Sequence, residues 1–122
     1  MKIAIPVDKE GMEGAVCASF GRAPFFFLYE TETKEWSVVE NSGLASPGGA
    51  GIKAAQIVVD SKAKALLTPR CGENAAQVLE SAGITLHKTS STSVEESIES
   101  FVQGKLPLLK DIHPGLSGHG RD

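Results

Sequence analysis

Residues 65–87 read ALLTPRCGENAAQVLESAGITLH, and this stretch decides the fold class. Ala65–Thr68 is a short apolar strand, residues 73–82 have the periodicity of a helix, and Ile84–His87 is a second strand. Gly83 stands where a helix is usually followed by a left-handed residue. A strand, a helix and a strand in close succession predict two parallel strands joined by a right-handed crossover, and therefore an α/β protein.

Three more strands are predicted before this unit. The first is Ile3–Val7, and the apolar runs Pro24–Thr31 and Glu35–Glu40 form a hairpin joined by a polar turn. Because Pro24–Thr31 is apolar on both faces, it should lie inside the sheet. If this second strand is antiparallel to its neighbours, the other strands all run the same way. The sequence then predicts a mixed five-stranded sheet of order 3-2-1-4-5, with helices packed on it.

Two more helices are predicted. One spans Ile52–Lys62 and follows a glycine-rich loop; the other follows Ser93, which forms a capping-box pattern with Glu96. The residues expected to face the core are Ile52, Ala55, Val58 and Val59 on the first helix and Val94, Ile98, Phe101 and Val102 on the second.

Length and composition indicate one cytoplasmic domain. The 122 residues are predicted to form a domain over residues 1–107 and a disordered tail over 108–122, which is rich in glycine and poor in apolar residues. A net charge of −3 favours neither nucleic acid nor an acidic membrane surface. No apolar run approaches the roughly 20 residues of a membrane span. With two cysteines and no export signal, a reducing compartment is expected.

The predicted topology gathers the most unusual loops at one edge of the sheet. The loop before the second strand and the loops after the first, third and fourth strands all leave the sheet there, where open α/β sheets bind ligands. The candidate residues on these loops are Cys17, Arg22, Gly49, Ala50, Gly51, Cys71 and Gly72.

These residue types suit an anionic ligand that binds sulfur. Glycines admit a close backbone approach, and a helix N-terminus offers N–H groups to an anion. Arg22 adds charge and donors, and the thiols of Cys17 and Cys71 are soft metal ligands. Cys71 stands beside Arg70 and just before a helix, and both features favour the thiolate.

The residues alone leave two functions open. Gly49–Ala54 fits the dinucleotide pattern, but it lacks the tight turn after a strand and the following acidic residue. No catalytic grouping stands out, so we expect a protein that is not an enzyme. A metal-cluster carrier would depend on the two thiols. A small-anion or nucleotide-binding regulatory domain would depend on backbone amides and Arg22.

Four motifs occur in an order that is similar to a known family: MKIAIPVD, FGRAPFFFLYE, GGAGIKAAQ and CGENAAQVLESAGI. Over residues 1–107 the sequence resembles the dinitrogenase iron–molybdenum cofactor biosynthesis family. The resemblance implies a ribonuclease-H-like three-layer α/β/α fold without nuclease activity. It also implies binding or carriage of iron–sulfur or iron–molybdenum clusters or their precursors, with cluster-assembly proteins as partners. Because the sequence offers few protein ligands, this binding is expected to be loose. Many members have His directly before Phe-Gly-Arg, where this sequence has Ser19.

Overall fold

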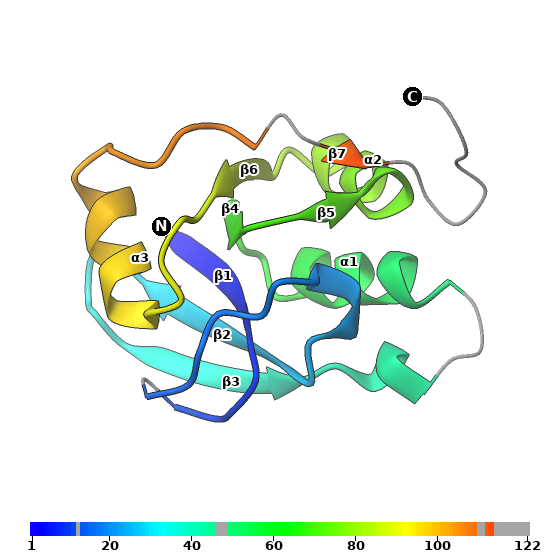
Figure 1. The fold of residues 1–122 in the computed structure, drawn as a ribbon, viewed down its shortest axis with the longest axis horizontal. Coiled ribbons are helices and arrows are strands. Elements are labelled where there is room, and N and C mark those ends of the chain that lie inside the picture. The colour runs from blue at the N-terminus through cyan, green and yellow to red at the C-terminus, as the bar shows by residue number, and fades with distance from the viewer. Residues whose placement is uncertain (12, 46–48, 110–111, 114–122) are drawn as a thin grey trace.

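The structure is a computed structural model that describes residues 1–11, 13–45, 49–109 and 112–113. A five-stranded sheet forms its middle, and helices cover both faces (Figure 1). The strands of this sheet are β1 (Lys2–Val7), β2 (Phe25–Glu30), β3 (Trp36–Glu40), β4 (Ala65–Thr68) and β6 (Thr85–Lys88). The helices are α1 (Ala50–Asp60), α2 (Glu73–Ser81) and α3 (Val94–Val102).

The sheet has the predicted strand order. Its strands follow one another as β3-β2-β1-β4-β6. Strand β2 is antiparallel to both β1 and β3, whereas β1 pairs with β4 and β4 with β6 in parallel. The prediction of a mixed sheet with an antiparallel second strand inside it is therefore confirmed.

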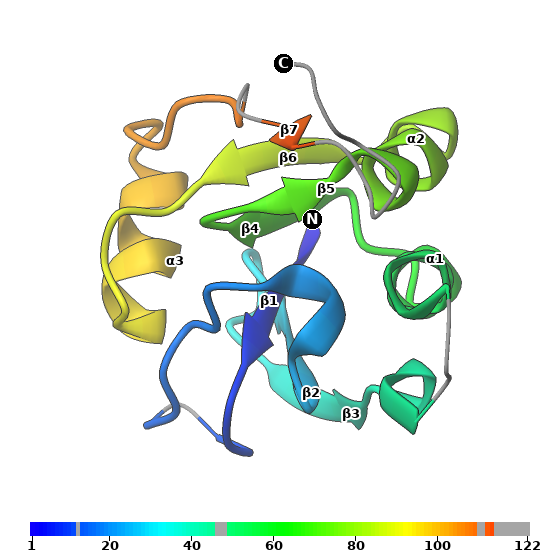
Figure 2. The same ribbon diagram turned by 45° about the vertical axis from the view of Figure 1, so that its right-hand side comes forward.

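Two apolar cores separate three layers. Helices α1 and α2 lie on one face of the sheet and α3 on the other (Figure 2). The first core contains Phe26 and Leu79, and the second contains Phe27 and Ile98. Because Phe26 and Phe27 are neighbours on β2, their side chains point to opposite faces, which is why this strand is apolar throughout. No helix of the described chain has the length and apolar content to cross a membrane.

Local signals place the helix ends as predicted. Gly83 and Gly104 follow α2 and α3 with φ of +81° and +74°, in the left-handed region that glycine enters at little cost. The Ser93 hydroxyl accepts a hydrogen bond from the backbone N–H of Glu96 at 3.1 Å, as an N-cap does. The Glu96 carboxylate accepts a hydrogen bond from the Ser91 hydroxyl at 2.7 Å.

Two residues predicted to face the core are exposed. Ile52 is 44% exposed and Val102 is 61% exposed. Ile52 lies in the first turn of α1, where the buried side is formed by Ala54, Ala55 and Val58 instead. Val102 is the last residue of α3, and the second core does not reach it. Periodicity identified the apolar positions but not how far the covering layer extends.

The segment 69–72 and the start of the predicted tail also differ from expectation. Cys71 and Gly72 were expected on the loop after the fourth strand, but they form a short strand, β5 (Cys71–Gly72), that pairs in parallel with β7 (Ile112–His113). Leu109 is buried in the first core, although it lies within the segment 108–122 that was predicted to be a disordered tail. The remaining tail residues, 110–111 and 114–122, lie outside the described residues. The domain boundary at residue 107 stays a prediction.

Candidate functional site

The loop between β1 and β2 folds back over the carboxyl end of β1. The backbone N–H of Cys17 donates to the carbonyl oxygen of Pro6 at 2.9 Å. The loop then forms a turn of 3₁₀-helix, η1 (Phe20–Arg22). The Phe20 side chain is buried, with its ring centroid 5.3 Å from that of Phe26. This aromatic anchor fixes the turn on the first core.

The turn η1 packs directly on the start of α1. A Cβ atom on Gly21 would lie 3.2 Å from the Cα atom of Gly51, so this close approach favours glycine at position 21. A Cβ on Gly51 would lie 3.7 Å from the Cβ of Ala75, which places the start of α1 against the start of α2. The turn also contacts β5. The structure therefore brings together the loop that carries Arg22, the start of α1 and the strand Cys71–Gly72.

A buried asparagine that the sequence analysis missed holds this arrangement. The Asn41 side chain is 5% exposed, and its amide nitrogen donates to the carbonyl oxygens of Gly21 at 3.3 Å and Ala23 at 2.8 Å. Its amide oxygen accepts from the backbone N–H of Gly43 at 3.1 Å. Asn41 thus ties η1 to the segment after β3. An asparagine between a strand and a glycine-rich loop was the available signal, because Asn favours such local turns.

The two helices that meet here both begin without a side-chain cap. The residue before α1 is Gly49, with φ of +72°, and the residue before α2 is Gly72. The N–H groups of the first turn of a helix have no acceptor inside that helix, and the helix dipole adds partial positive charge. Two such ends side by side suit an anion, although Glu73 in the first turn of α2 opposes it.

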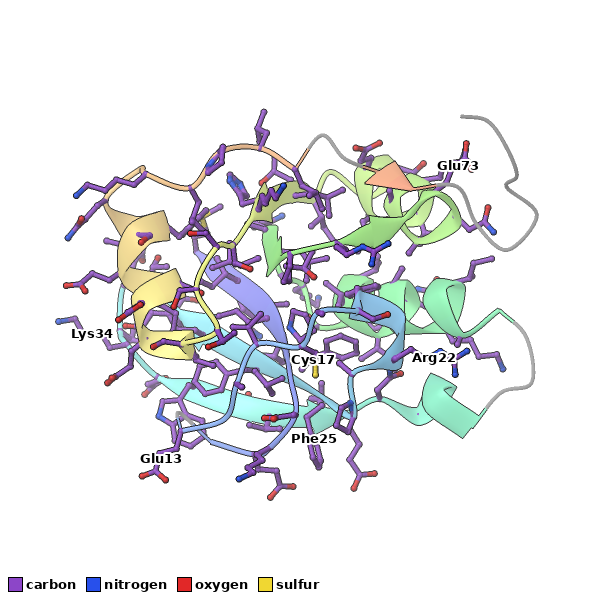
Figure 3. All side chains as sticks on the ribbon, viewed as in Figure 1. Glu13, Cys17, Arg22, Phe25, Lys34 and Glu73 are labelled. Carbon is purple, nitrogen blue, oxygen red and sulfur yellow. The ribbon has the colours of Figure 1, made fainter. Side chains whose placement is uncertain are left out.

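Arg22 and Cys17 occupy different parts of the same loop. Arg22 is exposed at the end of η1, and Figure 3 shows it on the side of α1. Cys17 is partly buried, and Figure 3 shows it nearer Phe25. Burial, with a smaller contribution from the charge of Asp8, raises the pKa of the Cys17 thiol. Arg22 is thus placed to add positive charge beside the helix ends, whereas Cys17 is a protonated thiol at neutral pH.

Cys71 is a packed residue, and its burial opposes the thiolate that its position beside Arg70 and before a helix was expected to favour. Its side chain is 1% exposed within the first core, and its thiol lies 3.6 Å from the carbonyl oxygen of Gly72. Burial, together with the charge of Glu80, raises the pKa of Cys71 to about 12. The loss of hydration therefore outweighs the neighbouring helix start and Arg70.

The described residues contain no group of three or more His, Cys, Asp or Glu side chains placed to hold a metal ion. His87 does not join the glycine-rich edge either. Its Nε2 lies 2.9 Å from the Thr85 hydroxyl, and its ring meets that of Phe101 edge-on at 5.0 Å. The donor set at the edge thus consists of backbone amides, one guanidinium and one accessible thiol.

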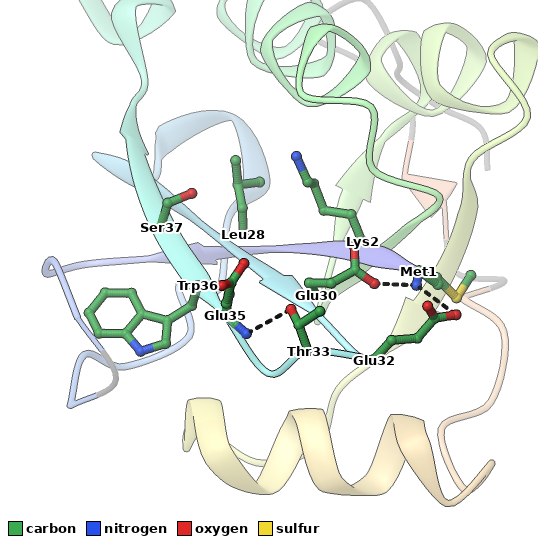
Figure 4. Close-up of a pocket in the computed structure, with 9 residues that line it drawn as sticks. All are labelled: Met1, Lys2, Leu28, Glu30, Glu32, Thr33, Glu35, Trp36 and Ser37. Atoms are coloured by element: carbon green, nitrogen blue, oxygen red, sulfur yellow. Dashed lines mark hydrogen bonds and ion pairs between the residues drawn. The ribbon is translucent and has the colours of Figure 1, made fainter.

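A groove of about 560 Å³ lies at the opposite end of the strands (Figure 4). It is lined by the start of β1, the turn between β2 and β3, and the carboxylates of Glu30, Glu32 and Glu35. None of the predicted site residues lines it. Its three carboxylates outnumber its two cationic groups, the N-terminal ammonium and Lys2, so the groove is less suited to an anion than the glycine-rich edge is.

Comparison with known proteins assigns the chain to a family. The family model described as dinitrogenase iron-molybdenum cofactor matches residues 1–104, and the chain belongs to this family. This membership connects it with iron–molybdenum cofactor binding or biosynthesis. The resemblance seen in the sequence motifs is therefore confirmed.

Two solved structures share the fold of this chain, and a third relative is similar in sequence. The apo form of the orange protein from Desulfovibrio gigas has a TM-score of 0.85 and 32% identity, over 89% of this chain and 92% of that one. A NifB-named Thermotoga protein of the DUF35 family has a TM-score of 0.78 and 30% identity, over 99% and 97% of the two chains. An uncharacterised protein of Methanocaldococcus jannaschii is 30% identical over 87% of this chain and 89% of its own length.

Proposed function

We propose that the protein binds an anionic metal–sulfur species, an iron–sulfur or iron–molybdenum cluster or its precursor, at the edge formed by η1 and the starts of α1 and α2. The observation that carries the proposal is the packing of Gly21 against Gly51, which sets Arg22 beside two uncapped helix starts. Family membership supports the class of cargo. The protein would act as a carrier or accessory in cofactor assembly and not as an enzyme.

Charge and hydrogen bonding supply most of the affinity in this proposal. Arg22 and the helix N–H groups would offset the negative charge of the cargo. Cys17 is the one thiol of the pair that solvent reaches, and it would supply a single soft ligand after losing its proton. Cys71 would contribute packing, because a thiol with a pKa of about 12 stays protonated. So few ligands make the binding loose and reversible, which suits a carrier that passes its cargo on.

A second candidate is a small-anion or nucleotide-binding regulatory domain. The burial of Cys71 favours it, because the site then depends on amides and Arg22 more than on sulfur. The two candidates differ in the need for a thiol. A cluster carrier requires Cys17, whereas a phosphate or nucleotide site does not.

The experiment is anaerobic incubation with iron, molybdate and sulfide, followed by gel filtration, metal analysis and visible absorption. Arg22→Gln and Cys17→Ser should each retain less metal and sulfide than the wild type. The control is Lys64→Gln, which removes an exposed positive charge at the other end of the strands and should retain as much as the wild type. If Arg22→Gln and Cys17→Ser retain as much metal and sulfide as the wild type, the proposal is contradicted. Phosphate or ATP binding that needs Arg22 but not Cys17 would favour the second candidate.

A further inference from the structure

The two edges of the main sheet differ in how they are covered. Along β6, the backbone N–H of Lys88 donates to Pro107 and that of Leu109 donates to Leu86, each at 2.9 Å. Residues 107–109 therefore cover this edge. At the other edge β3 is the last strand, and within the described residues no strand pairs with its outer side. An edge with unpaired N–H and C=O groups is a ready site for a further strand.

The hydrogen bonds at both ends of the hairpin show which groups of β3 point outward. The backbone N–H of Glu30 donates to the carbonyl oxygen of Glu35, and that of Asn41 donates to Pro24, each at 2.9 Å. In an antiparallel pair only alternate residues bond to a given neighbour. Residues 35, 37, 39 and 41 therefore bond to β2. The N–H and C=O groups of residues 36, 38 and 40 point away from the sheet.

Strand β3 lacks three of the features that commonly protect an edge. Natural edges carry a proline, a bulge or a central lysine, and Trp36–Glu40 has none of these and pairs continuously with β2. Instead it has a large exposed aromatic residue. The Trp36 side chain is 49% exposed and stacks on Phe27, with ring centroids 5.1 Å apart. Figure 4 shows the indole at the start of β3.

We propose that the protein forms a symmetric homodimer in which β3 pairs antiparallel with β3 of a second copy, with Ser37 on the twofold axis. This register places Trp36 opposite the partner's Val38, and the symmetry repeats this contact. It also brings Glu40, the last residue of β3, to the end of the paired strands beside the partner's Lys34. Lys34 lies in the turn before β3, where its N–H donates to the carbonyl oxygen of Glu30 at 2.8 Å, so only its side chain takes part. Aromatic pairs with β-branched residues and pairs of opposite charge are the stabilising cross-strand pairs of antiparallel sheets. The surface is thus complementary to itself, as an isologous interface requires.

The charges distinguish this register from the next one. With Val38 on the axis, Glu40 would face the partner's Trp36, and Lys34 would have no acidic residue opposite it. With Ser37 on the axis, the outward groups of Trp36 and Val38 bond to each other across the interface. The two copies of Ser37 then form a non-hydrogen-bonded pair, with Cα atoms about 4.5 Å apart.

The first test measures self-association by sedimentation equilibrium. Lys34→Glu and Glu40→Lys each place like charges opposite one another at two points and should raise the dimer dissociation constant by about tenfold or more. The double substitution restores opposite charges and should return the constant to within about threefold of the wild type. Lys105→Gln, on an exposed residue beyond α3, is the control and should change nothing. A wild type that stays monomeric at every concentration, or a double variant as weak as the single ones, overturns the proposal.

The second test traps the register with a disulfide. Ser37→Cys in a Cys17→Ser background places two thiols at a Cα separation that a disulfide accepts, so mild oxidation should give a covalent dimer. Val38→Cys in the same background should cross-link more slowly. The fluorescence of Trp36, the one tryptophan of the chain, should shift to the blue as protein concentration rises. Faster cross-linking at position 38, or fluorescence independent of concentration, would contradict the register with Ser37 on the axis.

Discussion

The close approach of Gly21 to the start of α1 gives a quantitative prediction for Gly21→Ala. The new Cβ would lie 3.2 Å from the Cα of Gly51 and 3.4 Å from its backbone nitrogen. Both neighbours are backbone atoms at the start of α1, so they can give way only if the turn or the helix moves. The backbone of Gly21 lies outside the left-handed region, and the cost therefore comes from space alone. Overpacking of this kind destabilises a fold by about 1–3 kcal/mol.

The assay is equilibrium unfolding in urea followed by far-ultraviolet circular dichroism. With the slope expected for a small domain, a loss of about 2 kcal/mol lowers the urea midpoint by about 1 M. Gly51→Ala is the matched control. Its Cβ would meet only the Cβ of Ala75 at 3.7 Å, an ordinary contact. Alanine also forms helix better than glycine, so stability should stay the same or rise by up to about 1 kcal/mol.

The contrast between the two variants tests the geometry. If Gly21→Ala unfolds at the same urea concentration as the wild type, η1 does not pack on α1 as described. If Gly51→Ala loses as much stability as Gly21→Ala, the loss does not depend on which atoms the new Cβ meets. The close contact between Gly21 and Gly51 then does not explain it. The displaced turn should also carry Arg22 away from the helix starts. Gly21→Ala should therefore retain less metal in the anaerobic assay.

Three other predictions concern titration and burial. The pKa of Cys71 is about 12 in the folded protein, whereas the thiol ionises near about pH 8.5 when the chain is unfolded. The contribution of the protonated thiol to stability is therefore fully present below about pH 8.5. Stability should fall by up to about 1.4 kcal/mol per pH unit between about pH 9 and 12, and this fall should be smaller in Cys71→Ala. Burial lowers the pKa of His87 in the folded protein. The neutral imidazole therefore contributes fully to stability above about pH 6.5, the pKa of an unfolded histidine, and this contribution is lost as the pH falls through the pKa of the folded protein. Acid unfolding curves of His87→Gln should consequently show a weaker pH dependence than those of the wild type. Leu109→Ala should lower the unfolding free energy by about 2–4 kcal/mol, and Leu108→Ala, at a 55% exposed position, by less than about 0.5 kcal/mol. Equal effects of the two leucine substitutions in urea would show that residues 107–109 do not dock on β6.

The strand order could be predicted because its signals are local and numerous. Each strand is a short apolar run between turn residues. Helix α1 connects β3 to β4 and helix α2 connects β4 to β6, and crossovers between parallel strands of one sheet have one hand. The helix ends are local as well. A glycine in the left-handed region or a serine at an N-cap acts on backbone groups within four residues of itself. Neighbours along the chain therefore determine these features.

The meeting of the loops at one edge follows from the same topology. Because β2 is antiparallel and the remaining strands are parallel, the carboxyl ends of β1, β3 and β4 must lie at the same edge of the sheet as the start of β2. That places Arg22, Gly49 and Cys71 in the same region without any knowledge of packing. It does not say which of their side chains solvent reaches.

Only the tertiary structure decided the chemical state of the candidate residues. Cys71 is protonated because Leu79 and other side chains of the first core surround it, and desolvation acts through atoms far away in sequence. The glycine at position 21 has its reason in a helix thirty residues later, and Asn41 has its reason in the carbonyl groups of η1. Ile52 stays exposed because no segment among the described residues covers it. Burial and close contact depend on which distant segments fill the space around a residue, and a linear pattern of apolar and polar residues does not contain that information.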